Sequence, residues 1–456
     1  MDSVAERPRK SGDKAAETSR DFSARGGFLG GIWAAGWYRA LGLGGIHSLF
    51  RLALSFITIK VTAVYLGPSG IALVAQLVNF IALASGFFGG GITTATSRLY
   101  PEFRHDPVSR KRFLATAWYL ACGLGVVSIV VIALGAAPLA RWLLTSDEHV
   151  DTMMLAGIAV ACMVLNGAIV SAINGAGEMG RVVVSGLIGS VVAFAVYVPA
   201  SMLWGVTGGL IGFAVSQMAF LPVTLWLLRG SPGVARGDFH GPFDPVQARR
   251  ILSFMPMLLA HSVMSPLGLI LIRDLVASHL GLATAGIWQA AWRLSEVYTG
   301  VVMASVSMYF LPRLGEVAGT PALRGEIIRT FWRAVGITAA FAVMIFLLRD
   351  WVVWIVFTDE FLPVRDLMPF QLLGDVVKMA AWTLGFVLVA LVRSRWYIAL
   401  EIAVPAIYFG GALWLVPQYG AQGVTWAYCL SAAVHLVVSV LALRDILLSG
   451  PRRLNA

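Results

Sequence analysis

The chain has 456 residues, of which 58% are hydrophobic and 13% are charged, and its formal net charge is +10. Soluble domains average about 25% charged residues, so this composition excludes a soluble globular protein and favours a polytopic membrane protein. A spanning helix needs about 20 mostly apolar residues. The sequence offers twelve such runs, and they are continuous rather than alternating, which indicates an all-α fold and not a β-barrel.

Residues 1–26 are polar and charged, and they are predicted to form a disordered cytoplasmic tail. They lack the apolar stretch of a signal peptide. The twelve predicted transmembrane helices follow this tail in chain order. They lie near residues 41–65, 71–92, 113–136, 150–173, 183–204, 208–228, 251–277, 284–311, 331–355, 367–391, 397–417 and 422–443.

Basic residues predict the orientation of these helices. Most of the 34 lysines and arginines lie in the termini and in one set of alternating loops, whereas the opposite loops hold only Arg141, Arg349 and Arg365. Positively charged loops stay in the cytoplasm, so we expect both termini to be cytoplasmic, which requires an even number of helices. The basic excess either serves this topology alone or also attracts anionic lipid headgroups.

Two glycine motifs recur at nearly one offset. Leu66-Gly67 and Gly70-Ile71 match Leu280-Gly281 and Gly286-Ile287, with an offset of 214 and a small insertion. Trp204-Gly205 and Gly208 match Tyr419-Gly420 and Gly423, with an offset of 215. We therefore predict two six-helix lobes in tandem. Six is even, so the repeats are parallel and related by an axis along the membrane normal.

This repeat sets the predicted domain boundaries. An N-lobe with helices 1–6 covers 27–228, and a C-lobe with helices 7–12 covers 251–444. A cytoplasmic linker rich in Gly, Pro and charge, 229–250, joins them, and 445–456 forms a second cytoplasmic tail. Two lobes that meet at a central cavity are typical of alternating-access transporters.

Among the charged residues of the predicted spans, eight lie near one depth, and the positive ones are in excess. Each cation costs at least about 2.5–3.5 kcal/mol at the bilayer centre, so such residues usually face a cavity, a partner or a polar substrate. The net-positive interior predicts an anion-binding site. The cations are Arg51, Lys60, Arg273, Arg293 and Lys378, and the carboxylates are Asp274, Glu296 and Asp375.

Helical periodicity places Arg51 on a polar stripe of the first span, together with Ser55 and Thr58. Arg51 is about ten residues from either end, so a cavity-facing role explains it better than snorkelling does. Lys60 lies half a turn away from this stripe and nearer the outer end. For Lys60, snorkelling and substrate binding remain equal alternatives.

The other embedded charges belong to the C-lobe. Arg273 shares one side of its span with serines, and the adjacent Asp274 could neutralise it. Arg293–Glu296 and Asp375–Lys378 are i, i+3 pairs, so each is either an inert local ion pair or a pair of separate functional groups.

Uncharged residues of the spans carry weaker signals. Gln76 and Asn79 are expected to hold helices together. Trp288 and Trp292 either stack on sugars or, as we prefer, lie at the membrane interface. No phosphate-binding loop and no metal-ligand spacing occurs in the sequence, and all three cysteines lie in apolar segments, so no cofactor, metal, disulfide or nucleic-acid partner is expected.

Several short motifs together resemble the Wzx-type lipid-linked oligosaccharide flippases, which include the lipid III and O-antigen flippases. This family belongs to the multidrug/oligosaccharidyl-lipid/polysaccharide exporter superfamily. The resemblance runs from about 36 to 445 and is densest between 285 and 400. It rests on Gly286-Ile287-Trp288-Gln289, Tyr309-Phe310-Leu311-Pro312-Arg313-Leu314, Leu348-Arg349-Asp350, Arg365-Asp366-Leu367 and Gly374-Asp375-Val376-Val377-Lys378.

The resemblance implies a V-shaped pair of six-helix lobes that moves undecaprenyl-diphosphate-linked oligosaccharide between leaflets of the bacterial inner membrane. It also implies basic residues at Arg51 and Lys60, and it implies a transporter and not an enzyme. Expected partners are the lipid-linked substrate, membrane lipids, and the polysaccharide polymerase and chain-length regulator of the same pathway. The polar tail and the acidic residue in Arg273-Asp274 depart from the family pattern.

Two other functions remain open on the sequence. An exporter of drugs or cations normally needs an embedded carboxylate, and the first six spans contain none apart from Asp151 at the very start of the fourth. A membrane glycan polymerase or glycosyltransferase would need a large outer loop, whereas the outward loops here are short.

Overall fold

The structure is a computed structural model that describes residues 12–391 and 393–449. Side chains are described for these residues apart from 12–52, 256–261, 394 and 448–449. The chain divides into two units, Met1–Ala53 and Leu54–Ala456. The first unit contributes the start of the first helix. The second unit contains all of the other described helices and both lobes.

Every regular element of the described residues is helical, which confirms the predicted all-α membrane fold. Helices satisfy their own backbone hydrogen bonds, as the bilayer interior requires. The α-helices are α1 Gly12–Phe103, α2 Pro107–Leu134, α3 Ala136–Leu143, α4 Val150–Gly175, α5 Met179–Met218, α6 Phe220–Leu228, α7 Pro245–Leu252, α8 Met255–Leu280, α9 Leu282–Val317, α10 Ala322–Leu347, α11 Arg349–Val356, α12 Val364–Ala390, α13 Ser394–Tyr419, α14 Ala421–Ala442 and α15 Arg444–Ser449. Short 3₁₀ helices lie at Asp147–His149, Arg236–Phe239 and Asp359–Phe361.

Four turns with a left-handed glycine join pairs of spans. Within the described residues ten helices are long and apolar enough to cross a membrane. Two of them contain a sharp break, α1 at Gly67 (φ 64°) and α5 at Gly205 (φ 56°). Counting the two sides of each break separately gives the twelve predicted spans.

The corresponding turns of the C-lobe are Gly281 (φ 87°) and Gly420 (φ 61°), at the offsets predicted for the repeat. Only glycine adopts this backbone conformation without a steric penalty. The four turns end spans one, five, seven and eleven, so all four lie on the same side of the membrane. We call it the turn side. The fold is thus two parallel six-helix lobes.

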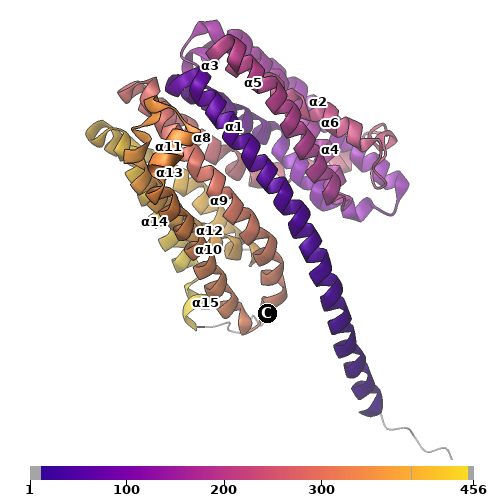
Figure 1. Ribbon diagram of the computed structural model, residues 1–456. Helices are drawn as coiled ribbons and strands as arrows, with labels where there is room; N and C mark the ends of the chain where they lie inside the picture. The colour runs from indigo at the N-terminus through magenta and orange to yellow at the C-terminus, as the bar shows by residue number, and fades with distance from the viewer. Residues whose placement is uncertain (1–11, 392, 450–456) are drawn as a thin grey trace, which may run out of the picture. The chain divides into compact units, whose positions relative to one another are not determined.

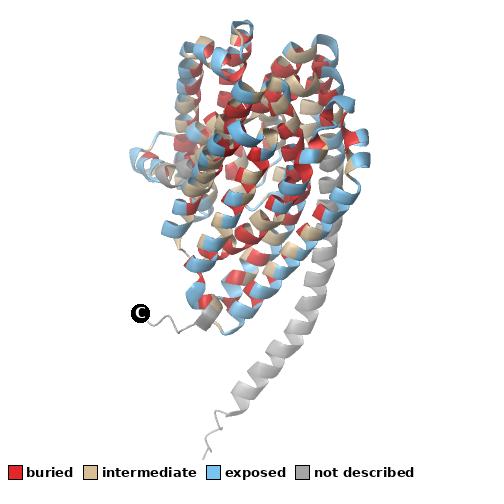
Figure 2. Cartoon of the chain, turned by 90° about the vertical axis from the view of Figure 1, so that its left-hand side faces the viewer, coloured by how far each residue is buried: buried red, intermediate tan, exposed pale blue. Residues whose placement is uncertain are grey.

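Each lobe has its own apolar core. The N-lobe core runs through α1, α2, α4 and α5, and it includes the buried Leu77, Phe113 and Val160. The C-lobe core joins α8, α9, α12 and α14, with Trp288 and Leu367 at its centre. Figure 1 shows α2–α6 gathered in one bundle and α8–α14 in another. In Figure 2 buried residues mark the faces where helices meet.

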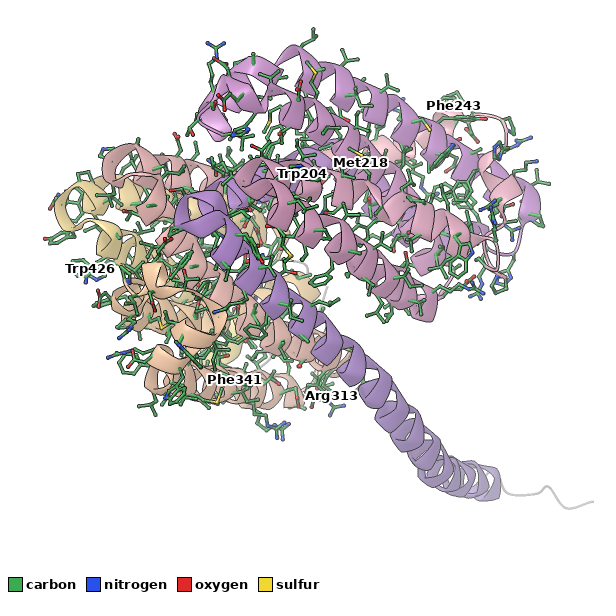
Figure 3. The ribbon with its side chains drawn as sticks, turned by 45° about the horizontal axis from the view of Figure 1, so that its top comes forward. Trp204, Met218, Phe243, Arg313, Phe341 and Trp426 are labelled. Carbon is green, nitrogen blue, oxygen red and sulfur yellow. The ribbon has the colours of Figure 1, made fainter. Side chains whose placement is uncertain are left out.

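Large apolar side chains cover much of the outer surface, as expected where helices face lipid. Leu134 is 82% exposed and Leu347 is 73% exposed. Phe341 on α10 is also exposed on an outer face (Figure 3). A soluble protein rarely exposes apolar surface on this scale. The polar exceptions inside the spans therefore call for a functional explanation.

The linker is folded onto the N-lobe. Glu178 Oε1 accepts hydrogen bonds from Ser231 Oγ and Gly233 N, both at 2.7 Å. Asp238 forms an ion pair with Arg110 at 3.1 Å. Phe243, which Figure 3 labels on this loop, is half exposed. The linker is therefore held by the N-lobe as far as α7, and the connection to the C-lobe follows that helix.

The start of the chain differs from the prediction. The backbone of residues 12–26 is helical as the beginning of α1, whereas the sequence predicted a disordered tail over 1–26. Alanine, glutamate and lysine in this segment favour a helix, although it lacks an apolar face. Residues 1–11 lie outside the described residues.

Candidate functional site

Lys60 joins the two lobes near the turn side. It lies on the first span of α1, and its Nζ donates to the carbonyl oxygen of Trp354 at 3.1 Å and to that of Phe357. These carbonyls lie at the C-terminal end of α11, where the helix leaves them without intrahelical partners. A cation also interacts favourably with the negative end of the helix dipole. Lys60 thus caps a C-lobe helix from the N-lobe.

Arg273 is enclosed between the lobes. Its side chain on α8 is 1% exposed. Nη1 donates to Gln76 Oε1 at 2.6 Å, and Nη2 donates to Gln289 Oε1. In the amide orientation that satisfies both residues, Asn79 Oδ1 accepts from both η nitrogens, at 3.2 and 3.1 Å. Gln76 and Asn79 belong to the N-lobe, so they hold helices together as predicted.

Asp274 points away from Arg273. Its Oδ2 accepts from Trp142 Nε1 of α3 at 3.3 Å. Consecutive residues of a helix point about 100° apart, so the two side chains do not meet. No salt bridge of the described residues includes Arg273. The expected neutralisation of Arg273 by Asp274 is therefore wrong.

Arg293 and Glu296 on α9 form the local ion pair that their spacing allowed. Arg293 Nη1 lies 2.8 Å from Glu296 Oε2, and both side chains are nearly half exposed. Trp292 Nε1 donates to the other carboxylate oxygen at 3.0 Å. The Arg293 guanidinium keeps further donors free for a ligand because only Nη1 is used by this pair.

Asp375 and Lys378 on α12 have different partners. Asp375 is 1% exposed, and its two oxygens accept from the hydroxyls of Tyr298 and Tyr428, each at 2.7 Å. Lys378 Nζ lies over three aromatic rings, at 4.5 Å from Trp382, 4.9 Å from Trp292 and 5.4 Å from Tyr428. Aromatic faces attract cations without neutralising them.

Asp375 and Lys378 are absent from the salt bridges of the described residues, so of the two alternatives the inert local ion pair does not apply to them. The charges of Asp375 and Glu296 both act on Lys378. The i, i+3 spacing places both side chains on one face of α12, but the Asp375 carboxylate is bound by the hydroxyls of Tyr298 and Tyr428 and not by Lys378.

Several residues of the site escaped the sequence analysis. Tyr298 and Tyr428 gave no signal, because a tyrosine in an apolar span is also typical of a membrane interface. Trp288 and Trp292 are buried in the C-lobe core, at 0% and 7% exposed, so their predicted interfacial position is wrong. Their closeness to Arg293 along the chain was the available clue. The side chain of Arg51 lies outside the described residues.

The arrangement of the spans matches known transporter structures. The lipid II flippase MurJ in an inward closed conformation aligns with a TM-score of 0.73 and 14% identity, over 88% of this chain and 87% of that protein. An inward-facing multidrug resistance MATE family transporter of the MOP superfamily aligns with a TM-score of 0.68 and 16% identity, over 89% of this chain and 96% of that one. The chain therefore shares the multi-pass fold of these two proteins.

Sequence comparison gives the family within this fold. The chain belongs to the family described as polysaccharide biosynthesis protein, which matches residues 61–366. The lipid III flippase of Escherichia coli (strain K12) is 26% identical over 390 residues, which are 85% of this chain and 93% of that protein. The lipid III flippase of Shigella flexneri is similar to the same extent. These findings confirm the resemblance to Wzx-type flippases.

Proposed function

We propose that the protein moves undecaprenyl-diphosphate-linked oligosaccharide from the cytoplasmic to the outer leaflet of the bacterial inner membrane. One observation carries this proposal. Three of the four described embedded cations, Lys60, Arg273 and Lys378, form no salt bridge with any described residue. A diphosphate diester carries about two negative charges, and arginine binds phosphate oxygens in a bidentate manner. The spans thus offer positive charge that a diphosphate can use.

The two lobes suit such a substrate physically. Its sugars and diphosphate need a polar, enclosed path, whereas its polyprenyl chain is soluble in the bilayer. Arg293 and Lys378 supply charge beside the aromatic rings of Trp292 and Trp382. The two relatives in sequence are lipid III flippases, and the enterobacterial common antigen and O-antigen units are the candidate cargoes.

The embedded carboxylates do not favour export of a cation. Glu296 is paired with Arg293, Asp375 accepts from two tyrosines and Asp274 accepts from Trp142. Each of these three carboxylates therefore already has donors. An organic cation would have to displace them, and it would also meet the surplus positive charge.

The connections on the turn side are too short to form the large loop that a glycan polymerase would need for its catalytic groups. Pairs of spans join there through single glycine turns such as Gly67 and Gly281. The remaining connections on that side are built around the eight-residue helices α3 and α11. We infer transport rather than catalysis. We also infer cytoplasmic termini, a periplasmic turn side and functional partnership with a polysaccharide polymerase and a chain-length regulator.

Purified protein in sealed vesicles tests the proposal. We expect lipid-linked oligosaccharide added to one leaflet to reach the other leaflet chemically unchanged. Efflux of a cationic drug without movement of the lipid-linked sugar would establish the exporter alternative instead. A new glycosidic bond in the recovered lipid would establish the glycosyltransferase alternative.

A further inference from the structure

Arg273 carries an uncompensated charge at the boundary between the lobes. Its η nitrogens donate to neutral amides only, from Gln76 and Asn79 of the N-lobe and from Gln289 of the C-lobe. Its Nε is buried without a partner. The indole ring of Trp288 lies 5.7 Å from the guanidinium carbon. An arginine cannot lose its proton to relieve such burial, so the closed arrangement leaves both a charge and a donor unsatisfied.

Other groups do not remove this charge. Glu296 is the carboxylate whose charge acts on Arg273, but its oxygens are in contact with Arg293 and Trp292. Burying a charge without a contacting counter-ion is unfavourable even when amides solvate it. The contact between the lobes therefore includes the Arg273 guanidinium, whose burial would become more favourable if an anion bound to it.

The position of Arg273 couples it to the turn side. Arg273 is eight residues before Gly281, and Gln76 is nine residues after Gly67, so both lie about 12–14 Å from their turns. Between them and the turns the lobes touch, because a Cβ at Gly286 of α9 would overlap the Pro68 carbonyl of α1. Releasing Gln76 from Arg273 removes the shorter of two bonds beneath that contact, and the bond from Gln76 Nε2 to the Ile270 carbonyl oxygen, at 3.3 Å, remains.

We propose that Arg273 is a positioning residue that senses the substrate's diphosphate and releases the turn-side contact between the lobes. Phosphate oxygens replace Gln76 and Asn79 as acceptors, and the charge-assisted link between Arg273 and the N-lobe span is broken. Charge-assisted bidentate bonds to phosphate are stronger than bonds to neutral amides. The ligand therefore binds the released arrangement better than the closed one, which is what shifts a conformational equilibrium. This inference rests on the proposed function.

The test measures the distance between the lobes with spin labels. Trp204 and Tyr419 occupy equivalent exposed positions just before the turn glycines Gly205 and Gly420, and Trp204 is labelled in Figure 3. Labels are attached at Trp204→Cys and Tyr419→Cys after Cys122, Cys162 and Cys429 have been replaced by alanine. In the full-length protein we expect undecaprenyl diphosphate to shift the population toward longer distances and undecaprenol to leave it unchanged.

Arg273→Gln keeps hydrogen-bonding capacity but removes the charge. We expect no shift with undecaprenyl diphosphate, transport slower by about tenfold or more, and a melting temperature no lower than that of the wild type, since a neutral side chain suits this burial better. Arg273→Lys should retain part of the shift. Arg324→Gln, at an exposed cation of α10, is the matched control and should behave as wild type.

The outcomes separate this inference from the proposed function. If the wild type transports the lipid and shifts its distances, but Arg273→Gln does so equally well, the sensing role is wrong and the transporter stands. If undecaprenol shifts the distances as much as undecaprenyl diphosphate, the diphosphate is not what is sensed. If the wild type transports no lipid-linked oligosaccharide, the proposed function itself fails.

Discussion

Asp375 and Lys378 show how one helical turn can separate two environments. The carboxylate has two tyrosine donors, and the ammonium lies among aromatic rings. A carboxylate in the place of Lys378 would face the negative faces of these rings. A lysine in the place of Asp375 would face two hydroxyls in a buried site. The two residues are therefore not interchangeable.

We expect the exchange of Asp375→Lys with Lys378→Asp to abolish transport, as each single change does. The exchange keeps the charge and the spacing of the pair, but it places each charged group among neighbours that suit the other one. The matched control exchanges the exposed pair Arg141 and Asp147, which lie 3.1 Å apart, and it should retain transport. Vesicle transport at equal protein content is the measurement. An active Asp375/Lys378 exchange would mean that the separate environments of the two residues are not needed for transport.

Arg51 remains the predicted diphosphate ligand of the first span. Arg51→Ala should reduce transport by about tenfold or more while leaving membrane insertion intact, because a bidentate phosphate ligand is lost. Arg51→Lys keeps the charge and should keep part of the activity. Transport and insertion are measured on the same preparation. Full activity of Arg51→Ala would remove this residue from the site.

The sequence predicted which charged residues belong to the site, but it did not predict which residues they contact. The five cations and three carboxylates could be read from the sequence because charges in apolar spans are conspicuous. Their partners could not, because Gln76, Gln289, Tyr298 and Tyr428 lie on other helices than the charges they contact. Pairwise spacing finds only neighbours on the same helix, as it did for Arg293 and Glu296.

At the scale of elements, Gly286 of α9 allows the closest approach between the lobes. A Cβ there would overlap the backbone of Pro68. Gly286→Ala should therefore disfavour the closed turn side by about 1–3 kcal/mol, the usual cost of overpacking. The spin-label distances across the turn side should lengthen without substrate, and coupled transport should fall.

Gly300 provides the control on the same helix. Nothing lies within 4 Å of a Cβ at that position, so Gly300→Ala should leave both distances and transport unchanged. Unaltered distances in Gly286→Ala would mean that the turn-side contact is not tight in the membrane.

The predicted spans agree with the helices except where short helices follow them. The sequence predicted one span over 331–355, whereas α10 ends at Leu347 and α11 begins at Arg349. No Gly or Pro marks the break, and the charged Arg349-Asp350 was the available signal in the sequence. Trp351 and Trp354 are exposed, at 64% and 69%, which is typical of a helix at the membrane interface. The glycine turns were predictable because they stand at repeated offsets.

At the scale of the whole molecule, the N-terminal segment is expected to be dispensable. Residues 2–25 lack the apolar content to pack, and the family match begins only at residue 61. Deleting them should leave transport in vesicles unchanged, with orientation still set by Arg39 and the basic residues of 98–112. Loss of transport at normal expression would contradict this expectation.

The central claim is that the cationic interior carries the lipid's diphosphate across the membrane. It is tested most directly by comparing two substrates in vesicles, the same oligosaccharide linked to undecaprenyl diphosphate and to undecaprenyl monophosphate. A membrane-impermeant sugar-modifying reagent reports the leaflet that each substrate occupies. We expect the diphosphate-linked sugar to cross several times faster in the wild type, and this preference to disappear in Lys378→Met. Equal rates for the two substrates in the wild type would contradict the claim.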